Sequence, residues 1–193
     1  ERCNGVPGLN GIESPCSFCY KRNTPTGRTM SLDTFKKIIS KTIVQGNSSF
    51  LTQIAFGADA GAKYNPDLFL MMEHAKSFGI IPNITVAHIS DEVADKLASH
   101  CGAVSVSRYA DKNICYNTVK KLTDRGMKQV NIHAMLSKET FNNVKETLND
   151  YLVDDRLSKL NAIVILSLKK RGRGEKYTQA STDQFKELVD FAM

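Results

Sequence analysis

The sequence has little that would tie it to a membrane, a nucleotide loop or a repeat architecture. No apolar stretch approaches the roughly 18 consecutive residues that a membrane-spanning helix needs. No P-loop, Rossmann glycine fingerprint or Ser-His-Asp pattern stands out. Internal repeats beyond a strand-helix unit and low-complexity tracts are also missing. These absences argue against an integral membrane protein, a common nucleotide-binding enzyme and a solenoid.

The composition is that of one ordinary globular domain. The chain has 193 residues, of which 41% are hydrophobic and 24% charged, enough to bury a sizeable core. With 26 basic and 20 acidic residues the net charge is +6, which is compatible with an anionic substrate or nucleic acid and diagnostic of neither. Five cysteines in a chain of this length are too sparse for a disulfide framework, so we expect reduced thiols and a cytoplasmic location.

Three of the five cysteines lie near the start of the chain, in residues 1–30, here called the cysteine loop. Twelve residues separate Cys3 from Cys16, and two separate Cys16 from Cys19. The stretch is rich in Gly, Pro, Asn and Ser, which favours a wrapping loop over a helix or strand. Three thiolates suit an open metal or cluster site, because a structural zinc site closes with four ligands.

Other interpretations of the CxxC pair remain open at this point. Such pairs also occur in zinc knuckles and redox motifs. However, no second CxxC and no Cys/His pair at zinc-finger spacing follows, which argues against a closed zinc site.

Residues 31–193 alternate between helix and strand patterns. Helices are expected after the cap Ser31 up to Gly46, from Asn65-Pro66 to Gly79, after Ser90, over 112–124, after the cap Ser137, and after a capping box at 181–184. Strands are expected at 52–59, 83–87, 103–107, 130–136 and 162–168. This order predicts an α/β fold with a parallel sheet in a single domain.

The strands are apolar on one face and small or polar on the other. The polar face carries Gln53, Ala55, Gly57, Asp59, Asn83, Thr85, Ala87, Ser105, Ser107, Asn131, His133 and Met135. A parallel sheet is usually buried on both faces. We therefore expect a sheet curled around a wet interior, which is an open, partial (β/α) barrel with its site at the carboxyl ends of the strands.

The run Cys16-Ser17-Phe18-Cys19-Tyr20 resembles the second half of the CxxxCxxC motif of the radical SAM superfamily, with Phe18 in the aromatic position. The residue four before Cys16 is Ile12, so Cys3 would supply the first thiolate in a long-spaced variant. The resemblance implies a [4Fe-4S] cluster held by Cys3, Cys16 and Cys19. It also implies cleavage of S-adenosylmethionine (SAM) to a 5′-deoxyadenosyl radical, with a flavodoxin or ferredoxin as electron donor.

The same resemblance implies contacts to SAM. The aromatic residues Phe18 and Tyr20 flank Cys19, and Phe18 corresponds to the family residue that lies against the adenine. The turn Phe56-Gly57-Ala58-Asp59-Ala60 resembles the family's GGE turn, with Ala58 for the second glycine and Asp59 for the glutamate. The alternative for this turn is an ordinary strand end with a solvated aspartate.

Further contacts are implied on two later strands. Ser107 and Arg108 resemble the SAM carboxylate and ribose contacts, Asn131 a ribose contact, and His133 a substrate or cofactor contact. Small residues that fill a narrow lumen and a structural histidine are the alternatives. The basic run at 169–173 could neutralise an acidic ligand or be a solvated loop.

The resemblance leaves the substrate open among small molecules, nucleobase precursors and peptides. It also implies a first barrel strand just upstream of Glu1, so we expect the sequence to be a fragment. A non-enzymatic, basic α/β module that binds zinc or nucleic acid is the competing hypothesis.

Overall fold

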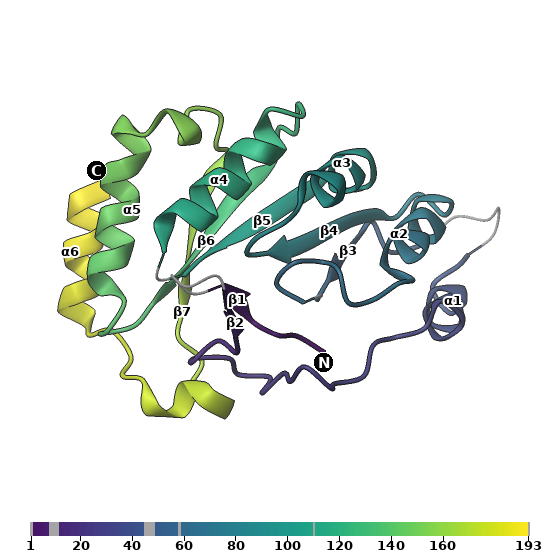
Figure 1. The fold of residues 1–193 in the computed structure, drawn as a ribbon, viewed down its shortest axis with the longest axis horizontal. Coiled ribbons are helices and arrows are strands. Elements are labelled where there is room, and N and C mark those ends of the chain that lie inside the picture. Colours follow the sequence, from purple (N-terminus) through teal and green to yellow (C-terminus); the bar gives the residue numbers. More distant parts are fainter. Residues whose placement is uncertain (1, 8–11, 45–48, 58, 110, 193) are drawn as a thin grey trace.

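A five-stranded parallel sheet forms the centre of the molecule (Figure 1). The computed structural model describes residues 2–7, 12–44, 49–57, 59–109 and 111–192. The sheet order is β3-β4-β5-β6-β7, so strands that follow one another in the chain are hydrogen-bonded neighbours. Their bounds are β3 Gln53–Phe56, β4 Ile81–Val86, β5 Ala103–Arg108, β6 Val130–Leu136 and β7 Ala162–Ser167. This arrangement confirms the predicted α/β class and the parallel sheet.

Six α-helices accompany the sheet in the described residues. They are α1 Leu32–Ser40, α2 Leu68–Lys76, α3 Asp91–His100, α4 Lys112–Thr123, α5 Phe141–Val153 and α6 Thr182–Ala192. Two 3₁₀ turns follow α5 and β7, namely η2 Asp155–Leu157 and η3 Gly172–Lys176. The cysteine loop contains a short antiparallel hairpin, β1 Val6–Pro7 with β2 Glu13–Ser14.

Side-chain caps begin several helices where the sequence predicts them. The Ser31 hydroxyl accepts the Thr34 N–H at 3.3 Å, and the Ser90 hydroxyl accepts the Val93 N–H at 3.3 Å. At α6 the Gln184 N–H donates to the Ser181 hydroxyl and the Ser181 N–H donates to the Gln184 side chain, each at 3.1 Å. That reciprocal pair is the predicted capping box.

Several predicted helix boundaries are wrong. The second helix begins at Leu68 after the N-cap Asp67, and not at Asn65-Pro66. The first helix ends at Ser40, because the Thr42 hydroxyl donates to the Ile39 carbonyl at 2.8 Å and Ile43 forms a β-bridge with Ser49. The predicted stop, Gly46, lies outside the described residues.

The fifth helix begins at Phe141 and not directly after Ser137. Thr140 is its N-cap residue, and the Thr140 hydroxyl accepts the Ser137 N–H at 2.9 Å and donates to the Met135 carbonyl at 2.6 Å. These bonds form a separate turn between β6 and α5.

The two faces of the sheet differ as predicted. Val104, Val106, Val130 and Ile132 are fully buried and belong to the main apolar cluster, which includes side chains of helices α2 to α5. The alternate residues of β4, β5 and β6 are only half-buried. Helices therefore cover one face, while the other face is left for the cysteine loop and a cavity.

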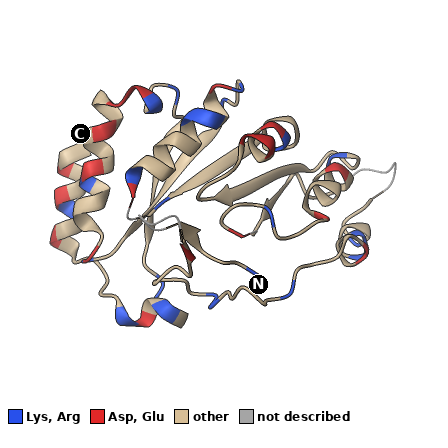
Figure 2. Ribbon diagram, viewed as in Figure 1, with Lys and Arg blue, Asp and Glu red and all other residues tan. Residues whose placement is uncertain are grey.

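Charged residues of both signs share the outer helices (Figure 2). Lys96 pairs with Glu92, and Lys120 with Asp124, each at 2.7 Å across one helical turn. Among the helices that the structure describes, none is both long enough and apolar enough to cross a bilayer.

Candidate functional site

A cavity of about 680 Å³ lies where the carboxyl ends of the strands meet the cysteine loop. All five strands contribute to its wall through Ala55 and Phe56, Thr85 and Val86, Ser107 and Arg108, His133 and Met135, and Leu166 and Ser167. The volume is within the range of about 300–1,000 Å³ that small-molecule sites occupy. Ligand sites of parallel α/β folds lie at this end of the strands.

Most of the residues predicted for the site meet in this main cavity. Its lining includes Cys3, Cys16, Cys19, Phe18, Tyr20, Gly57, Ser107, Arg108 and His133. Asp59 and Asn131 are not part of the lining. Ala58 lies outside the described residues.

The three thiols of the cysteine loop are half-buried and free. The Cys19 N–H donates to the Cys16 carbonyl at 3.2 Å, which closes the CxxC turn, and the Gly5 N–H donates to Cys3 Sγ at 3.3 Å. Burial raises the pKa of Cys16, and the neighbouring Cys3 and Cys19 raise that pKa further. Cys3 and Cys19 are therefore each within electrostatic reach of Cys16. Within the described part of the chain, no three His, Cys, Asp or Glu side chains are arranged so that they could hold a metal ion.

Two aromatic side chains of the loop border the cavity in different ways. Phe18 packs against Tyr109, with ring centroids 5.2 Å apart. Tyr20 is 47% exposed and lies at the mouth, where the ammonium groups of Lys169 and Lys21 stand 4.7 and 5.9 Å from its ring centroid.

Sequence reasoning missed Tyr109, although the signal was present. Ser105, Ser107 and Tyr109 follow the same period of two, so all three point to the cavity side of the sheet. Ser107 and Cys16 neighbour the Tyr109 side chain, and both influence the pKa of its hydroxyl. Burial, with the neighbouring Cys16, raises the pKa of Tyr109, so the hydroxyl stays protonated at neutral pH.

Asp59 serves the turn after β3 and does not face the cavity. It is 4% exposed, and its carboxylate accepts the N–H groups of Gly61 at 3.0 Å, Lys63 at 3.1 Å and Tyr64 at 3.0 Å. Asp59 therefore belongs to a strand-end turn, as the alternative interpretation expected. Its carboxylate is buried, however, whereas that interpretation expected a solvated one.

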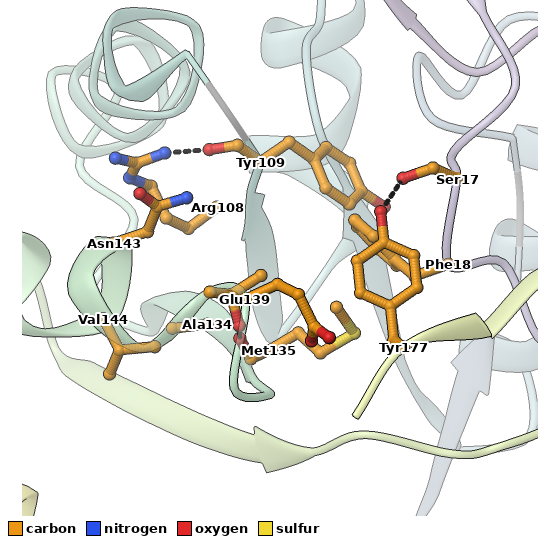
Figure 3. Close-up of a pocket in the computed structure, with 11 residues that line it drawn as sticks. Ser17, Phe18, Arg108, Tyr109, Ala134, Met135, Glu139, Asn143, Val144 and Tyr177 are labelled. Atoms are coloured by element: carbon orange, nitrogen blue, oxygen red, sulfur yellow. Dashed lines mark hydrogen bonds between the residues drawn. The ribbon is translucent and has the colours of Figure 1, made fainter. Parts of the chain in front are cut away.

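The guanidinium of Arg108 is engaged on the helix side of the sheet. Its side chain is 2% exposed, and Nη2 pairs with Glu146 at 2.7 Å. A second nitrogen donates to the Tyr109 carbonyl (Figure 3). Arg108 shares the strand face of Val104 and Val106, because side chains alternate along β5. The expected fork toward a ligand carboxylate is therefore not supported.

The two polar residues predicted on β6 have different positions. Asn131 has the expected facing but lies at the amino end of the strand, where its side-chain oxygen accepts a hydrogen bond from Asn161 at 2.8 Å. His133 lines the cavity, and burial lowers the pKa of its imidazole, which favours the neutral form at pH 7.

A smaller cavity of about 220 Å³ adjoins the main one. Figure 3 shows Met135, Glu139 and Tyr177 around it, and the Tyr177 hydroxyl is hydrogen-bonded to Ser17. Phe18 and Tyr109 line the main cavity, this smaller one and a third of about 560 Å³ beneath the hairpin. This aromatic pair is therefore a wall common to all three spaces.

An ionic cluster connects the hairpin to the segments that follow β3 and β4. The Glu13 carboxylate accepts hydrogen bonds from Lys63 Nζ at 2.6 Å and from the Tyr64 hydroxyl at 2.8 Å, and lies 3.1 Å from His88 Nε2. Burial acts to raise the pKa of Glu13, but these three hydrogen bonds lower it to about 2. Glu13 thus stays ionised and holds one side of the cysteine loop.

The site as a whole presents three thiols, two aromatic faces, several hydroxyls and a neutral imidazole to one cavity. Thiols are the ligand type that soft metals prefer, and the remaining lining suits a mixed polar and apolar organic ligand. In comparisons of the sequence with protein-family models and with curated proteins, nothing matches.

Proposed function

We propose that this chain forms the core of a radical SAM enzyme. Cys3, Cys16 and Cys19 would hold a [4Fe-4S] cluster, and SAM would bind beside it in the main cavity. The observation that supports this best is that all three thiols line one cavity together with the carboxyl ends of five parallel strands.

The donor set fits a cluster better than a single ion. A four-iron cluster takes each thiolate on a different iron, so the sulfurs border the cluster and need not meet at one point. Three cysteines leave one iron without a protein ligand. Coordination requires the thiols to lose their protons, and their partial burial in a preformed loop shields the bound group from water.

When bound, the cluster and SAM supply one-electron chemistry that yields a 5′-deoxyadenosyl radical, with a flavodoxin or ferredoxin as electron donor. The chain's own groups orient the ligand. Phe18 and Tyr20 offer aromatic faces to a planar base, and the hydroxyls of Ser107 and Tyr109 offer hydrogen bonds. Neutral His133 can accept or donate a hydrogen bond without adding charge.

A partial, open (β/α) barrel is the arrangement that we propose for the five strands. Its support is the half-buried, polar face of β4, β5 and β6, together with the cavity on that side of the sheet. A flat sheet covered by helices on both faces would bury these residues.

The test is anaerobic reconstitution with iron and sulfide, followed by metal analysis and a 5′-deoxyadenosine assay. We expect about four irons per chain and SAM cleavage. Cys16→Ala and Cys19→Ala should lose both, while the matched control Cys101→Ala, whose thiol packs on Met72 away from the cavity, should keep both.

A colourless wild-type protein that releases no 5′-deoxyadenosine would overturn the proposal. Zinc at one equivalent per chain in that protein would favour the competing zinc- or nucleic-acid-binding module. Full SAM cleavage by the Cys16 and Cys19 variants would show that the cysteines are incidental.

A further inference from the structure

The segment between β7 and α6 (residues 168–181, the β7–α6 connection) packs directly on the cysteine loop. In Figure 1 this yellow-green turn lies near the N-terminal segment, although the contacting residues are about 150 positions apart in the sequence. The segment contains the basic run at 169–173 that the sequence left without a role. Its contacts to the loop include hydrogen bonds to backbone carbonyls of the CxxC turn and side-chain contacts of Tyr177 with Ser17 and Phe18.

One residue of this connection donates three hydrogen bonds to the loop. The Arg173 N–H donates to the Cys19 carbonyl at 3.1 Å. Its side chain donates from Nε to the Cys16 carbonyl at 2.9 Å and from Nη2 to the Asn23 carbonyl at 3.2 Å. The carbonyls of both CxxC cysteines are therefore bound by the same arginine.

Two glycines allow the connection to approach this closely. A Cβ on Gly172, whose φ is +61°, would lie 2.6 Å from the Tyr20 carbonyl oxygen and 2.8 Å from that of Cys19. A Cβ on Gly174 would lie 3.2 Å from the Phe18 carbonyl oxygen and 2.7 Å from that of Lys169. Side chains at either position would separate the two segments.

We infer that Arg173 is a positioning residue for the thiols of the CxxC turn. Its side chain holds the Cys16 and Asn23 carbonyls and its backbone N–H holds the Cys19 carbonyl, so that both sulfurs face the main cavity. Within the turn, the Cys16 and Cys19 carbonyls also accept the N–H groups of Cys19 and Arg22. The planar guanidinium adds directed donors from outside the turn, to the carbonyls of Cys16 and Asn23, and so selects one arrangement of the loop. That the positioned thiols serve a cluster rests on the proposed function; the positioning itself does not.

Thiol reactivity in the metal-free protein tests this inference. The rate of alkylation by N-ethylmaleimide would be measured for each cysteine by peptide mass spectrometry. In Arg173→Ala we expect Cys16 and Cys19 to react about tenfold faster or more, because the loop opens locally. Cys101 and Cys115, in the α3 and α4 region of the core, serve as internal references and should keep their rates.

Three further variants separate geometry from charge. Arg171→Ala removes the same charge two residues away and should react like the wild type. Arg173→Lys keeps the charge but not the fork of donors, so it should resemble Arg173→Ala. Gly172→Ala should accelerate Cys16 and Cys19 as well, through contacts that do not involve the guanidinium.

The inference fails if Arg173→Ala matches Arg171→Ala. It also fails if all four cysteines accelerate by one factor, because that pattern reports global unfolding. Iron analysis of the same proteins separates the two proposals. If the wild type binds no iron, the proposed cluster is contradicted and the alkylation result still stands. If the wild type binds iron normally but Arg173→Ala keeps the wild-type alkylation rates, only the positioning role of Arg173 is contradicted.

Discussion

Two of the contacts that hold the cysteine loop in place differ in their chemistry. At the hairpin, the loop itself supplies the central side chain, because the Glu13 carboxylate binds Lys63, Tyr64 and His88. At the CxxC turn, the β7–α6 connection supplies it, because Arg173 binds backbone carbonyls of the loop. The first contact joins side chains, and the second orients the peptide groups next to the thiols.

The difference determines what each contact can control. A cluster of ionisable side chains responds to pH and salt and tolerates small backbone shifts. Hydrogen bonds from a guanidinium to carbonyls do not titrate in the physiological range, and they specify backbone conformation. The hairpin contact should therefore act mainly on stability, and the Arg173 contact on the direction of the thiols.

The largest effect should come from Gly172→Ala. The new Cβ would stand 2.6 Å from a backbone oxygen, at a positive φ that alanine adopts with strain. Overpacking and the unfavourable φ together should lower the free energy of unfolding by about 3 kcal/mol. Urea denaturation followed by circular dichroism measures this loss. Gly79→Ala, also at positive φ but with open space around it, is the control for the φ effect alone.

A smaller loss is expected from Glu13→Gln. The amide keeps the shape of the side chain but removes the charge that Lys63 and His88 face. Loss of a charged, partly buried hydrogen-bond acceptor should lower the free energy of unfolding by about 2 kcal/mol at pH 7. Glu92→Gln, on the exposed face of α3, loses only the pair with Lys96 and should lower the free energy of unfolding by less than about 0.5 kcal/mol. An equal shift in both variants would show that net charge matters and not the cluster.

The pH dependence of unfolding tests whether the Glu13 cluster stabilises the protein through its charge. The pKa of Glu13 is lowered from its ordinary value of 4.5 to about 2 in the folded protein. Its contribution is therefore present above pH 4.5 and is lost as the pH falls through 2. The stability difference between wild type and Glu13→Gln should shrink between pH 4.5 and pH 2. A constant difference over this interval would assign the effect to packing and not to ionisation.

Local patterns predicted those parts of the fold that depend on neighbours in sequence. Caps at Ser31, Ser90 and Ser181 and the strand order follow from periodicity and turn chemistry. The period of two also predicted correctly that Ser107 and His133 face the cavity. The same rule places Arg108 on the opposite face and Tyr109 on the cavity face, so both could have been assigned correctly from the sequence.

Other features were not accessible to local patterns. Alternation along a strand predicts which face a side chain is on, but not how far the residue lies from the carboxyl end. Asn131 is therefore on the cavity side of β6 but at its amino end, away from the cavity. The hydrogen bonds of Arg173 to Cys16 and Asn23 join segments about 150 residues apart, and a basic run carries no sign of its partner. Asp59 differs again, because its bonds are local to an Asx-type turn.

The smallest effect is expected at an exposed ion pair between the cysteine loop and the β7–α6 connection. Arg22 and Glu175 stand 3.6 Å apart, and their side chains are 67% and 62% exposed. Exposed pairs of this kind contribute little, so Glu175→Gln should change the free energy of unfolding by less than about 0.5 kcal/mol. The alkylation rates of Cys16 and Cys19 should also stay at the wild-type values, in 50 mM and in 500 mM salt alike. If Glu175→Gln exposed these thiols as strongly as Arg173→Ala, attraction between charges would hold the two segments together, and directed hydrogen bonds to the cysteine carbonyls would not be the cause.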